Sequence, residues 1–147
     1  MCGRFVRSSP AEKLITEFRL NHACLEVPPS FNAAPSDVIL IMRNDGERRL
    51  RACEWGFVPA WSKDPSAGLR IIHARAETVA LLPAFRSAFF LGNRCLIAAD
   101  GFYEWQKMER GKKPFYVRLR SGRPFGIAGL FNTLASDGGG EPVPVRS

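Results

Sequence analysis

The chain has 147 residues, of which 46% are hydrophobic, and this length and composition suit one globular domain spanning residues 1–147. It lacks a long apolar run and a signal peptide, which argues against a membrane protein and for a cytoplasmic one. The formal net charge of +7 favours a polyanionic partner such as nucleic acid, although a basic but inert surface is the alternative.

The first predicted element is a helix. Residues 9–12, Ser-Pro-Ala-Glu, form a capping-box pattern with proline at the first helical position. Leu14, Ile15 and Phe18 then fall on one helical face. The sequence therefore predicts a helix over about residues 10–20.

Strands follow this helix. Residues 25–37 are rich in Pro, Ser and Asn and predict a loop. Val38–Met42 and Leu50–Trp55 predict two strands, and the Asn-Asp-Gly sequence at 44–46 suits a hairpin turn between them. A central strand is predicted at Arg94–Ala99.

The second half mixes helix and strand. Thr78–Phe90 is helical in character, and Pro83 must either break it or start a second short helix. Phe115–Leu119 and Phe125–Leu130 predict a second hairpin, turned around residues 121–122. Because strands dominate and tight turns join neighbours, we predict an antiparallel α+β domain.

Four cysteines occur, and only one has a position that suggests chemistry. No pair has C-x-x-C or zinc spacing, so we expect no metal and no cofactor. Cys53 and Cys95 lie in apolar segments and are predicted to be small buried hydrophobes. Cys2 follows Met1, which methionine aminopeptidase removes when the next residue is small. We therefore expect a mature chain that begins at Cys2.

An N-terminal cysteine carries an amine and a thiol on neighbouring carbons. The amine forms an imine with an aldehyde, and the thiol then closes a five-membered thiazolidine on the same carbon. Arg4 favours the thiolate. The same group could instead attack a carbonyl as an N-terminal nucleophile, or Cys2 could follow Met1 by chance.

Two polar segments are candidate functional sites. Glu104 is a lone carboxylate among the aromatics of residues 101–105 and could move protons, or it is an exposed glutamate in a turn. If extended, His73, Arg75 and Glu77 share one face and could bind phosphate or move protons. The alternative for these three is a salt-bridged surface strand.

Two further segments are candidates for nucleic-acid binding. Residues 31–35 and 55–61 combine aromatic residues and proline beside basic residues. Aromatic residues next to cations suit single-stranded nucleic acid, because bases stack on the rings and phosphates pair with the cations. Ordinary core packing is the alternative.

Taken together, these motifs resemble the SOS-response-associated peptidase (SRAP) family, which shields abasic sites in single-stranded DNA. The matching pieces are Met-Cys-Gly-Arg at 1–4, Asn-Ala-Ala-Pro at 32–35, Trp-Gly at 55–56 with Pro59 and Trp61, Ala-Arg-Ala-Glu at 74–77, and Ala-Asp-Gly-Phe-Tyr-Glu-Trp at 99–105. The resemblance implies a barrel-like antiparallel sheet with a few short helices.

The resemblance also implies roles for residues near the reaction. Cys2 resembles the residue that forms the thiazolidine with the ring-opened abasic sugar. Glu104 resembles the acid that assists imine formation and sugar opening. His73 stands where the family usually has an Asn that contacts the abasic nucleotide, so we expect it to assist there. The family's later His-Asp-Arg-Met-Pro-like segment has no match, and we expect this chain to lack the C-terminal portion of the family pattern.

Other residues resemble the family's DNA-binding surface. Arg4 and Arg75 resemble phosphate-binding arginines. Pro35 and Trp61 resemble apolar residues where the strand is bent, and Asn32 is expected to shape the pocket floor.

The expected function is covalent crosslinking of single-stranded DNA at abasic sites, a lyase-like activity in the DNA damage response. The sequence does not reveal the oligomeric state, and a monomer is the default. The alternatives are an N-terminal cysteine peptidase, as the family name suggests, and a non-covalent single-strand binder.

Overall fold

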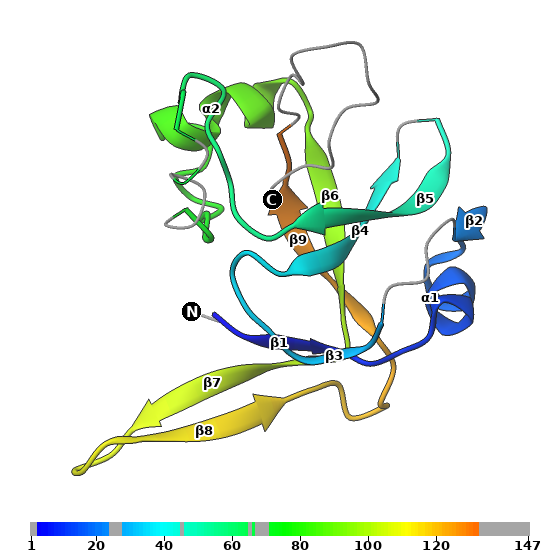
Figure 1. The fold of residues 1–147 in the computed structure, drawn as a ribbon, viewed down its shortest axis with the longest axis vertical. Coiled ribbons are helices and arrows are strands. Elements are labelled where there is room, and N and C mark those ends of the chain that lie inside the picture. The colour runs from blue at the N-terminus through cyan, green and yellow to red at the C-terminus, as the bar shows by residue number, and fades with distance from the viewer. Residues whose placement is uncertain (1–2, 24–27, 45, 65, 67–70, 133–147) are drawn as a thin grey trace.

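The computed structural model (Figure 1) describes residues 3–23, 28–44, 46–64, 66 and 71–132. Among them, nine strands form two sheets. The four-stranded sheet has the order β3 (Ser30–Ala33), β1 (Phe5–Arg7), β7 (Gly101–Lys107) and β8 (Lys112–Val117). The five-stranded sheet has the order β2 (His22–Ala23), β5 (Arg48–Glu54), β4 (Val38–Asn44), β6 (Arg94–Ala99) and β9 (Phe125–Leu130).

The pairing confirms the predicted α+β class. Every strand pair is antiparallel except the short parallel pair β2–β5. Two helices, α1 (Ala11–Phe18) and α2 (Pro83–Phe90), accompany the sheets. The described strands form two separate sheets and do not close into one barrel.

Helix α1 confirms the predicted apolar face, but its start differs from the prediction. Leu14 is fully buried, and Ile15 and Phe18 pack beside it. The expected capping box does not form, since Pro10 holds the N-cap position without a side-chain cap. The Ser9 hydroxyl instead donates to the carboxylate of Asp100. This partner is distant in sequence and competes with the local cap.

One predicted hairpin is confirmed and the other is wrong. β4 and β5 pair from Val38–Glu54 to Asn44–Arg48, so both strands are longer than predicted. Phe115–Leu119 and Phe125–Leu130 do not pair with each other. β8 pairs with β7 in one sheet, and β9 pairs with β6 in the other. The turn predicted at residues 121–122 does exist, because Gly122 donates to the carbonyl of Leu119, but it carries the chain between sheets.

Of the two possibilities predicted for residues 78–90, the structure confirms the second: Pro83 starts a short helix. A turn occupies residues 76–82, and α2 begins at Pro83, where proline needs no backbone N–H partner. Phe85 and Ala88 are the buried residues of α2, and Phe85 packs on Phe57 with ring centroids 5.1 Å apart.

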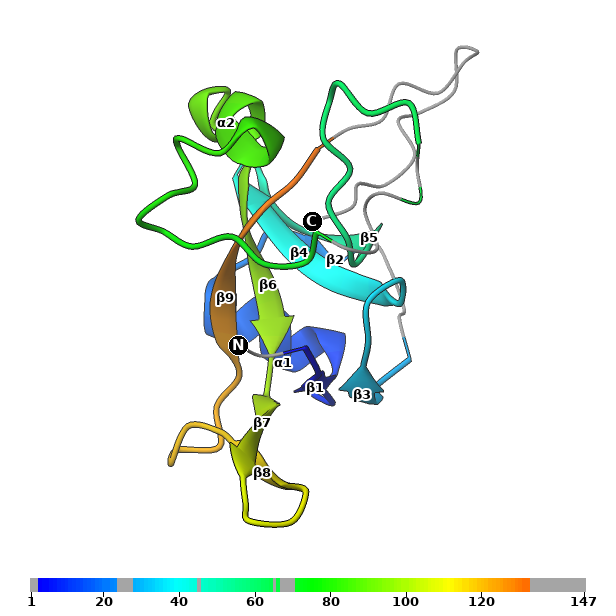
Figure 2. The same ribbon diagram turned by 90° about the vertical axis from the view of Figure 1, so that its left-hand side faces the viewer.

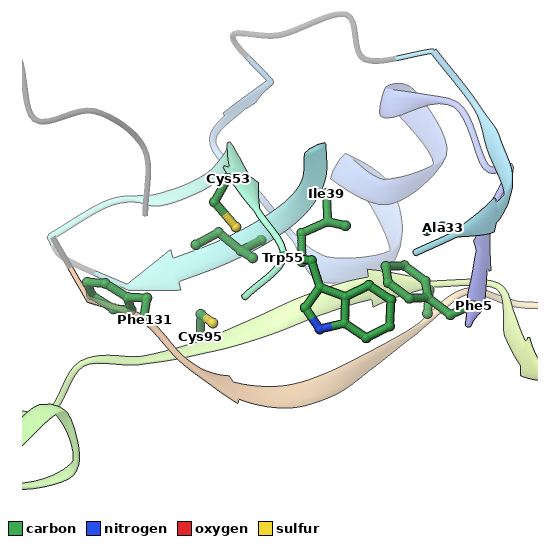
Figure 3. Close-up of a cluster of buried hydrophobic side chains, with 9 residues drawn as sticks. Phe5, Ala33, Ile39, Cys53, Trp55, Cys95 and Phe131 are labelled. Atoms are coloured by element: carbon green, nitrogen blue, oxygen red, sulfur yellow. The ribbon is translucent and has the colours of Figure 1, made fainter. Parts of the chain in front are cut away.

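The largest core cluster joins the two sheets (Figure 3). Phe5 of β1 meets Trp55, just after β5, edge to face at 5.2 Å. Cys53 and Cys95 are buried free thiols in the same cluster, as predicted. Burial raises the pKa of Cys95 to about 12. This packing fixes β1 against the five-stranded sheet.

A single residue, Asp100, separates β6 from β7 and lies where the sheets meet. Its N–H donates to the carbonyl of Val6 at 2.8 Å. Its carboxylate accepts the backbone N–H groups of Ser8 and Ser9, at 2.6 and 2.8 Å, and the Ser9 hydroxyl. Burial alone would raise the pKa of Asp100, but these hydrogen bonds lower it below its ordinary value. Asp100 therefore ties the end of β1 to the junction of the two sheets.

Candidate functional site

The start of the described chain lies between two strands. β1 is paired with β3 on one side, Phe5 opposite Ala33, and with β7 on the other, Phe5 opposite Phe102. In Figure 1 the N-terminal end of β1 therefore emerges beside β7. A Cβ placed on Gly3 would meet no atom within 4 Å beyond its chain neighbours. The space beside this N-terminal segment is open.

Glu104 lies in the middle of β7, next to this segment. The N–H of Tyr103 donates to the carbonyl of Arg4 at 2.9 Å, which continues the β1–β7 ladder by one residue. The next position in an antiparallel register sets Glu104 beside Gly3. Glu104 is half-buried and pairs with Phe115 of β8. It is thus a strand residue and not the exposed turn glutamate of the alternative interpretation.

Tyr103 is a residue to which the sequence analysis gave no role. Its hydroxyl donates to the carbonyl of Phe31 in β3 at 3.1 Å. Because β1 lies between β3 and β7, this bond connects the two strands that flank β1. The pattern of aromatics around Glu104 drew attention to this segment, but the partner in β3 is 72 residues away in sequence.

Asn32 and Pro35 lie on the β3 side of the N-terminal segment. Asn32 is an exposed residue of β3, and Pro35 is half-buried in the turn that follows. This turn is well held, since the Asp37 carboxylate accepts the N–H of Ala34 at 2.9 Å and Ser36 donates to the carbonyl of Trp55 at 2.8 Å. The predicted loop at 25–37 was wrong over β3, whose four residues are too few to show strand periodicity.

His73 shares a small cavity with the N-terminal strand. The cavity has a volume of about 200 Å³, and Phe5, Trp55 and His73 are among its lining residues. Residues 71–75 have no regular structure, but Phe57 donates to the carbonyl of Ile71 at 2.9 Å. This bond brings the His73 segment alongside the core beneath β1.

Arg75 lies two residues further on and is exposed. Its carbonyl accepts the N–H groups of Thr78 and Val79, so the chain turns here. The prediction that His73, Arg75 and Glu77 share one face required an extended strand. Because the chain turns at Arg75, Glu77 does not continue such a strand. Arg75 and Glu77, both described, do not form a salt bridge with each other. The salt-bridged alternative is thus not what the structure contains.

Trp61 belongs to a different part of the molecule. Its side chain is 68% exposed, and its indole Nε1 donates to the carbonyl of Pro83 at 3.4 Å. Trp61 therefore contacts α2 and not the strands β3 and β7 that carry Asn32 and Glu104. Its high exposure rules out the core-packing alternative for this ring, whereas Trp55 in the same motif is buried.

The larger cavity lies elsewhere. It has a volume of about 620 Å³ and is mainly apolar, with Arg43, Arg48 and Arg94 among its lining residues. None of the predicted site residues lines it. We therefore base the candidate site on strand register and the smaller cavity, and not on cavity size.

The structure thus gathers part of the predicted site. Asn32 and Glu104 lie on β3 and β7, Arg4 directly precedes the intervening strand β1, and His73 lines the small cavity together with Phe5 of β1. Cys2 lies outside the described residues, as does the predicted loop at 137–144. Among the residues that the structure places, no three His, Cys, Asp or Glu side chains gather to hold a metal ion. No helix in these ranges is both long and apolar enough to cross a membrane.

Known proteins resemble this chain in sequence. The pattern of the family described as SOS response associated peptidase (SRAP) matches residues 1–145. The abasic site processing protein YoaM of Bacillus subtilis (strain 168) is 40% identical over 143 residues, which are 95% of this chain and 63% of YoaM. The abasic site processing protein YedK of Escherichia coli (strain K12) is 32% identical over 139 residues, 90% of this chain and 60% of YedK. The chain thus spans less than two thirds of the length of these relatives.

Solved structures share the fold. A protein from Bordetella bronchiseptica superposes with a TM-score of 0.77 at 27% identity, covering 90% of this chain and 64% of that one. A protein from Bacteroides thetaiotaomicron gives a TM-score of 0.81 at 19% identity, covering 97% of this chain and 65% of that one. The second likeness concerns the fold alone.

Proposed function

The chain belongs to the SOS response associated peptidase (SRAP) family, and from this premise we propose that it binds single-stranded DNA and links Cys2 covalently to the aldehyde of an abasic site. The product is a thiazolidine, which shields the lesion. The relatives YoaM and YedK, named as abasic site processing proteins, support an abasic site as the target.

One observation carries the proposal: the N–H of Tyr103 donates to the carbonyl of Arg4, which extends the β1–β7 ladder toward the N-terminus, and continuing this register by one residue sets Glu104 beside Gly3. Gly3 directly follows Cys2, so a carboxyl group stands next to the segment that bears the reactive amine and thiol. The open space beside Gly3 leaves room for a substrate. Core packing of Phe5 on Trp55 holds β1 in place.

The chemistry needs only groups of this chain. The Cys2 amine adds to the aldehyde carbon of the ring-opened sugar and gives a carbinolamine. The proton of the Cys2 thiol passes through the Glu104 carboxyl to the hydroxyl, which leaves as water, so that an iminium and a thiolate form. The Cys2 thiolate adds to the same carbon, and the electron pair of the C=N bond returns to nitrogen. The sum is amine, thiol and aldehyde giving thiazolidine and water.

Other residues serve the DNA. Arg4 and the exposed Arg75 supply positive charge for phosphates. Asn32 and Pro35 border the N-terminal segment on its β3 side, and the exposed ring of Trp61 offers a surface on which a base can stack. His73, at the cavity below β1, is suited to hydrogen-bond the abasic nucleotide or move a proton.

Intact-mass spectrometry tests the proposal. The purified chain, which we expect to begin at Cys2, is incubated with single-stranded DNA that contains one abasic site. We expect a heat-stable adduct at the summed mass minus one water. Cys2→Ser should give at most a labile imine, because an oxygen analogue closes a less stable ring, and Cys2→Ala should not close a ring.

Each alternative predicts a different result. A peptidase would cleave a peptide without DNA and would need no abasic site. A non-covalent binder would show salt-sensitive affinity and no adduct. A stable adduct of wild-type yield in Cys2→Ala, or with Met1 retained, would contradict the thiazolidine.

A further inference from the structure

The positive charge of the chain is concentrated in one hairpin, the ribbon, which we define as residues 105–120. It contains six of the basic residues, Lys107, Arg110, Lys112, Lys113, Arg118 and Arg120, and one acidic residue, Glu109. Its net charge is therefore +5, in a chain whose total is +7. In Figures 1 and 2, β7 and β8 extend together away from the rest of the molecule.

These cations are not neutralised by carboxylates of the described chain, and their one internal contact within it is that of the Lys113 ammonium with the Phe115 ring, 5.3 Å from its centroid. All six are exposed, and none of them forms a salt bridge within the described chain. Arg123, just beyond the ribbon, shows the contrast, because it forms a paired hydrogen bond with Glu17 at 2.7 and 2.9 Å. Six neighbouring like charges repel one another, and a polyanion would relieve that repulsion.

One face of the ribbon carries aromatic rings together with lysines. Side chains alternate along a strand, so Trp105 and Lys107 of the ribbon, and Tyr103 just before it, share a face with their partners in β8, which are Pro114, Lys112 and Tyr116. The rings are neighbours, with centroids 6.4 Å apart for Tyr103–Trp105 and 5.5 Å for Tyr103–Tyr116. Trp105 and Tyr116 are each more than two-fifths exposed. Exposed rings beside cations suit unpaired bases and their phosphates.

Protection of a sheet edge accounts for only part of this pattern. β8 is an edge strand, and lysine and proline at Lys112, Lys113 and Pro114 discourage pairing with another chain. That role also disfavours a second copy of this chain as the partner. It does not explain Lys107 in β7 or Arg110 in the turn.

We infer that the ribbon binds the single-stranded DNA that flanks the site beside Gly3. The inference rests on the proposed function, and it adds a second contact along the same strand. β7 runs from Glu104 to Lys107, about 10 Å at about 3.3 Å per residue. These two side chains lie on opposite faces of β7, so a DNA strand held at Glu104 reaches the ring-bearing face of the ribbon by crossing the edge of β7 beyond its pairing with β1. Phosphates would lie on Lys107 and Lys112, which are direct partners across β7 and β8.

The test compares two variants that each remove two positive charges. The ribbon variant is Lys107→Gln with Lys112→Gln. The control variant is Arg19→Gln with Arg86→Gln, two exposed arginines outside the ribbon. Binding of undamaged, fluorescein-labelled oligothymidine is measured against salt, with strands of about 4 and about 16 nucleotides, the range of site sizes of single-strand binders.

We expect the ribbon variant to bind the long strand about 25-fold more weakly near 0.1 M salt, with a log–log salt slope reduced by about 1.4, as two phosphate contacts require. Its affinity for the short strand and its thermal unfolding should match those of the control variant. Equal affinity of the two variants for the long strand, or no binding of it by the wild-type chain, would overturn the inference. A different outcome would contradict the proposed function alone. In it, the ribbon variant binds the long strand more weakly than the control variant, but the wild-type chain forms no adduct with abasic DNA.

Discussion

The backbone N–H of Tyr103 donates to the carbonyl of Arg4 at 2.9 Å, and this bond fixes which residue of β7 lies next to the N-terminal segment. A shift of one residue would exchange the two faces of β7 and turn the Glu104 carboxyl away. The Tyr103 hydroxyl, bonded to Phe31 in β3, resists such a shift. The position of the proposed proton donor is thus set by the strand ladder and not by a flexible loop.

Glu104→Gln tests the proton-transfer role. The amide keeps shape and polarity but cannot donate a proton to the departing hydroxyl, so single-turnover crosslinking should slow about a hundredfold or more. Affinity for undamaged single-stranded DNA should stay similar or rise, because a negative charge is removed. Equal crosslinking rates would exclude Glu104 from the mechanism. A parallel loss of binding and of folded protein would show that its role is structural.

Arg75→Ala tests the phosphate contact. The exposed guanidinium is not paired with Glu77, so its removal should reduce the log–log salt slope for single-stranded DNA by about 0.7, the value of one contact. The loss of affinity should be the same for all base sequences. Glu77→Gln is the matched control and should not lower the slope. A slope unchanged in Arg75→Ala would remove Arg75 from the DNA surface.

Asp100 should make folding sensitive to acid. Its pKa in the folded chain lies below the ordinary value of 3.8 because of hydrogen bonds from Ser9 and Ser8. A carboxyl whose pKa is lowered by folding stabilises the folded state. This stabilisation is complete when the pH is above the pKa in the unfolded chain, and it is lost as the pH falls through the pKa in the folded chain. Urea midpoints at pH 7 and at about pH 3 measure the effect. Asp100→Asn should lower the midpoint at pH 7 and reduce its change with pH.

The control for this prediction is Glu109→Gln, at the exposed tip of the ribbon. It should leave the urea midpoint and its pH dependence close to those of the wild-type chain. An Asp100→Asn variant with wild-type pH dependence would show that another group dominates acid unfolding.

The two buried thiols should be inert in the native chain. The pKa of Cys95 is raised to about 12 by burial, so its thiolate fraction at pH 8 is about a thousandfold or more below that of an ordinary cysteine. Iodoacetamide should leave Cys53 and Cys95 unmodified in buffer and modify both in urea, as read by peptide mass spectrometry. Rapid native labelling of either residue would mean that the core cluster opens.

The sequence predicted best those elements whose patterns are local. The β4–β5 hairpin has a long apolar strand, β4, followed by a turn sequence and a second strand of equal length, and α2 begins at a proline, so both could be located. β1 has three residues and β3 has four, too few for a periodic pattern. Phe115–Leu119 and Phe125–Leu130 each carry a strand pattern, but pattern alone cannot say which sheet a strand joins.

The candidate site was predictable where a motif carries its own chemistry. Glu104 was identified from its aromatic surroundings, but the sequence set it at a strand end, whereas it lies within β7. Asp100 stood in the same motif without a role, since its partners Ser8 and Ser9 are more than 90 residues away in sequence. Hydrogen bonds between residues so far apart do not produce a motif of fixed spacing in the sequence.

The pairing of Phe5 with Phe102 has a consequence for synthesis of the chain on the ribosome. β3 follows β1 closely, but β7 is made almost 100 residues later, which takes on the order of 5–20 s at about 5–20 residues per second. Until then β1 has a partner on one side only, and the four-stranded sheet cannot form around it. The edge of β1 that later pairs with β7 is therefore exposed during translation. β1, which precedes the other described strands in the chain, is thus among the last of them to be fully paired.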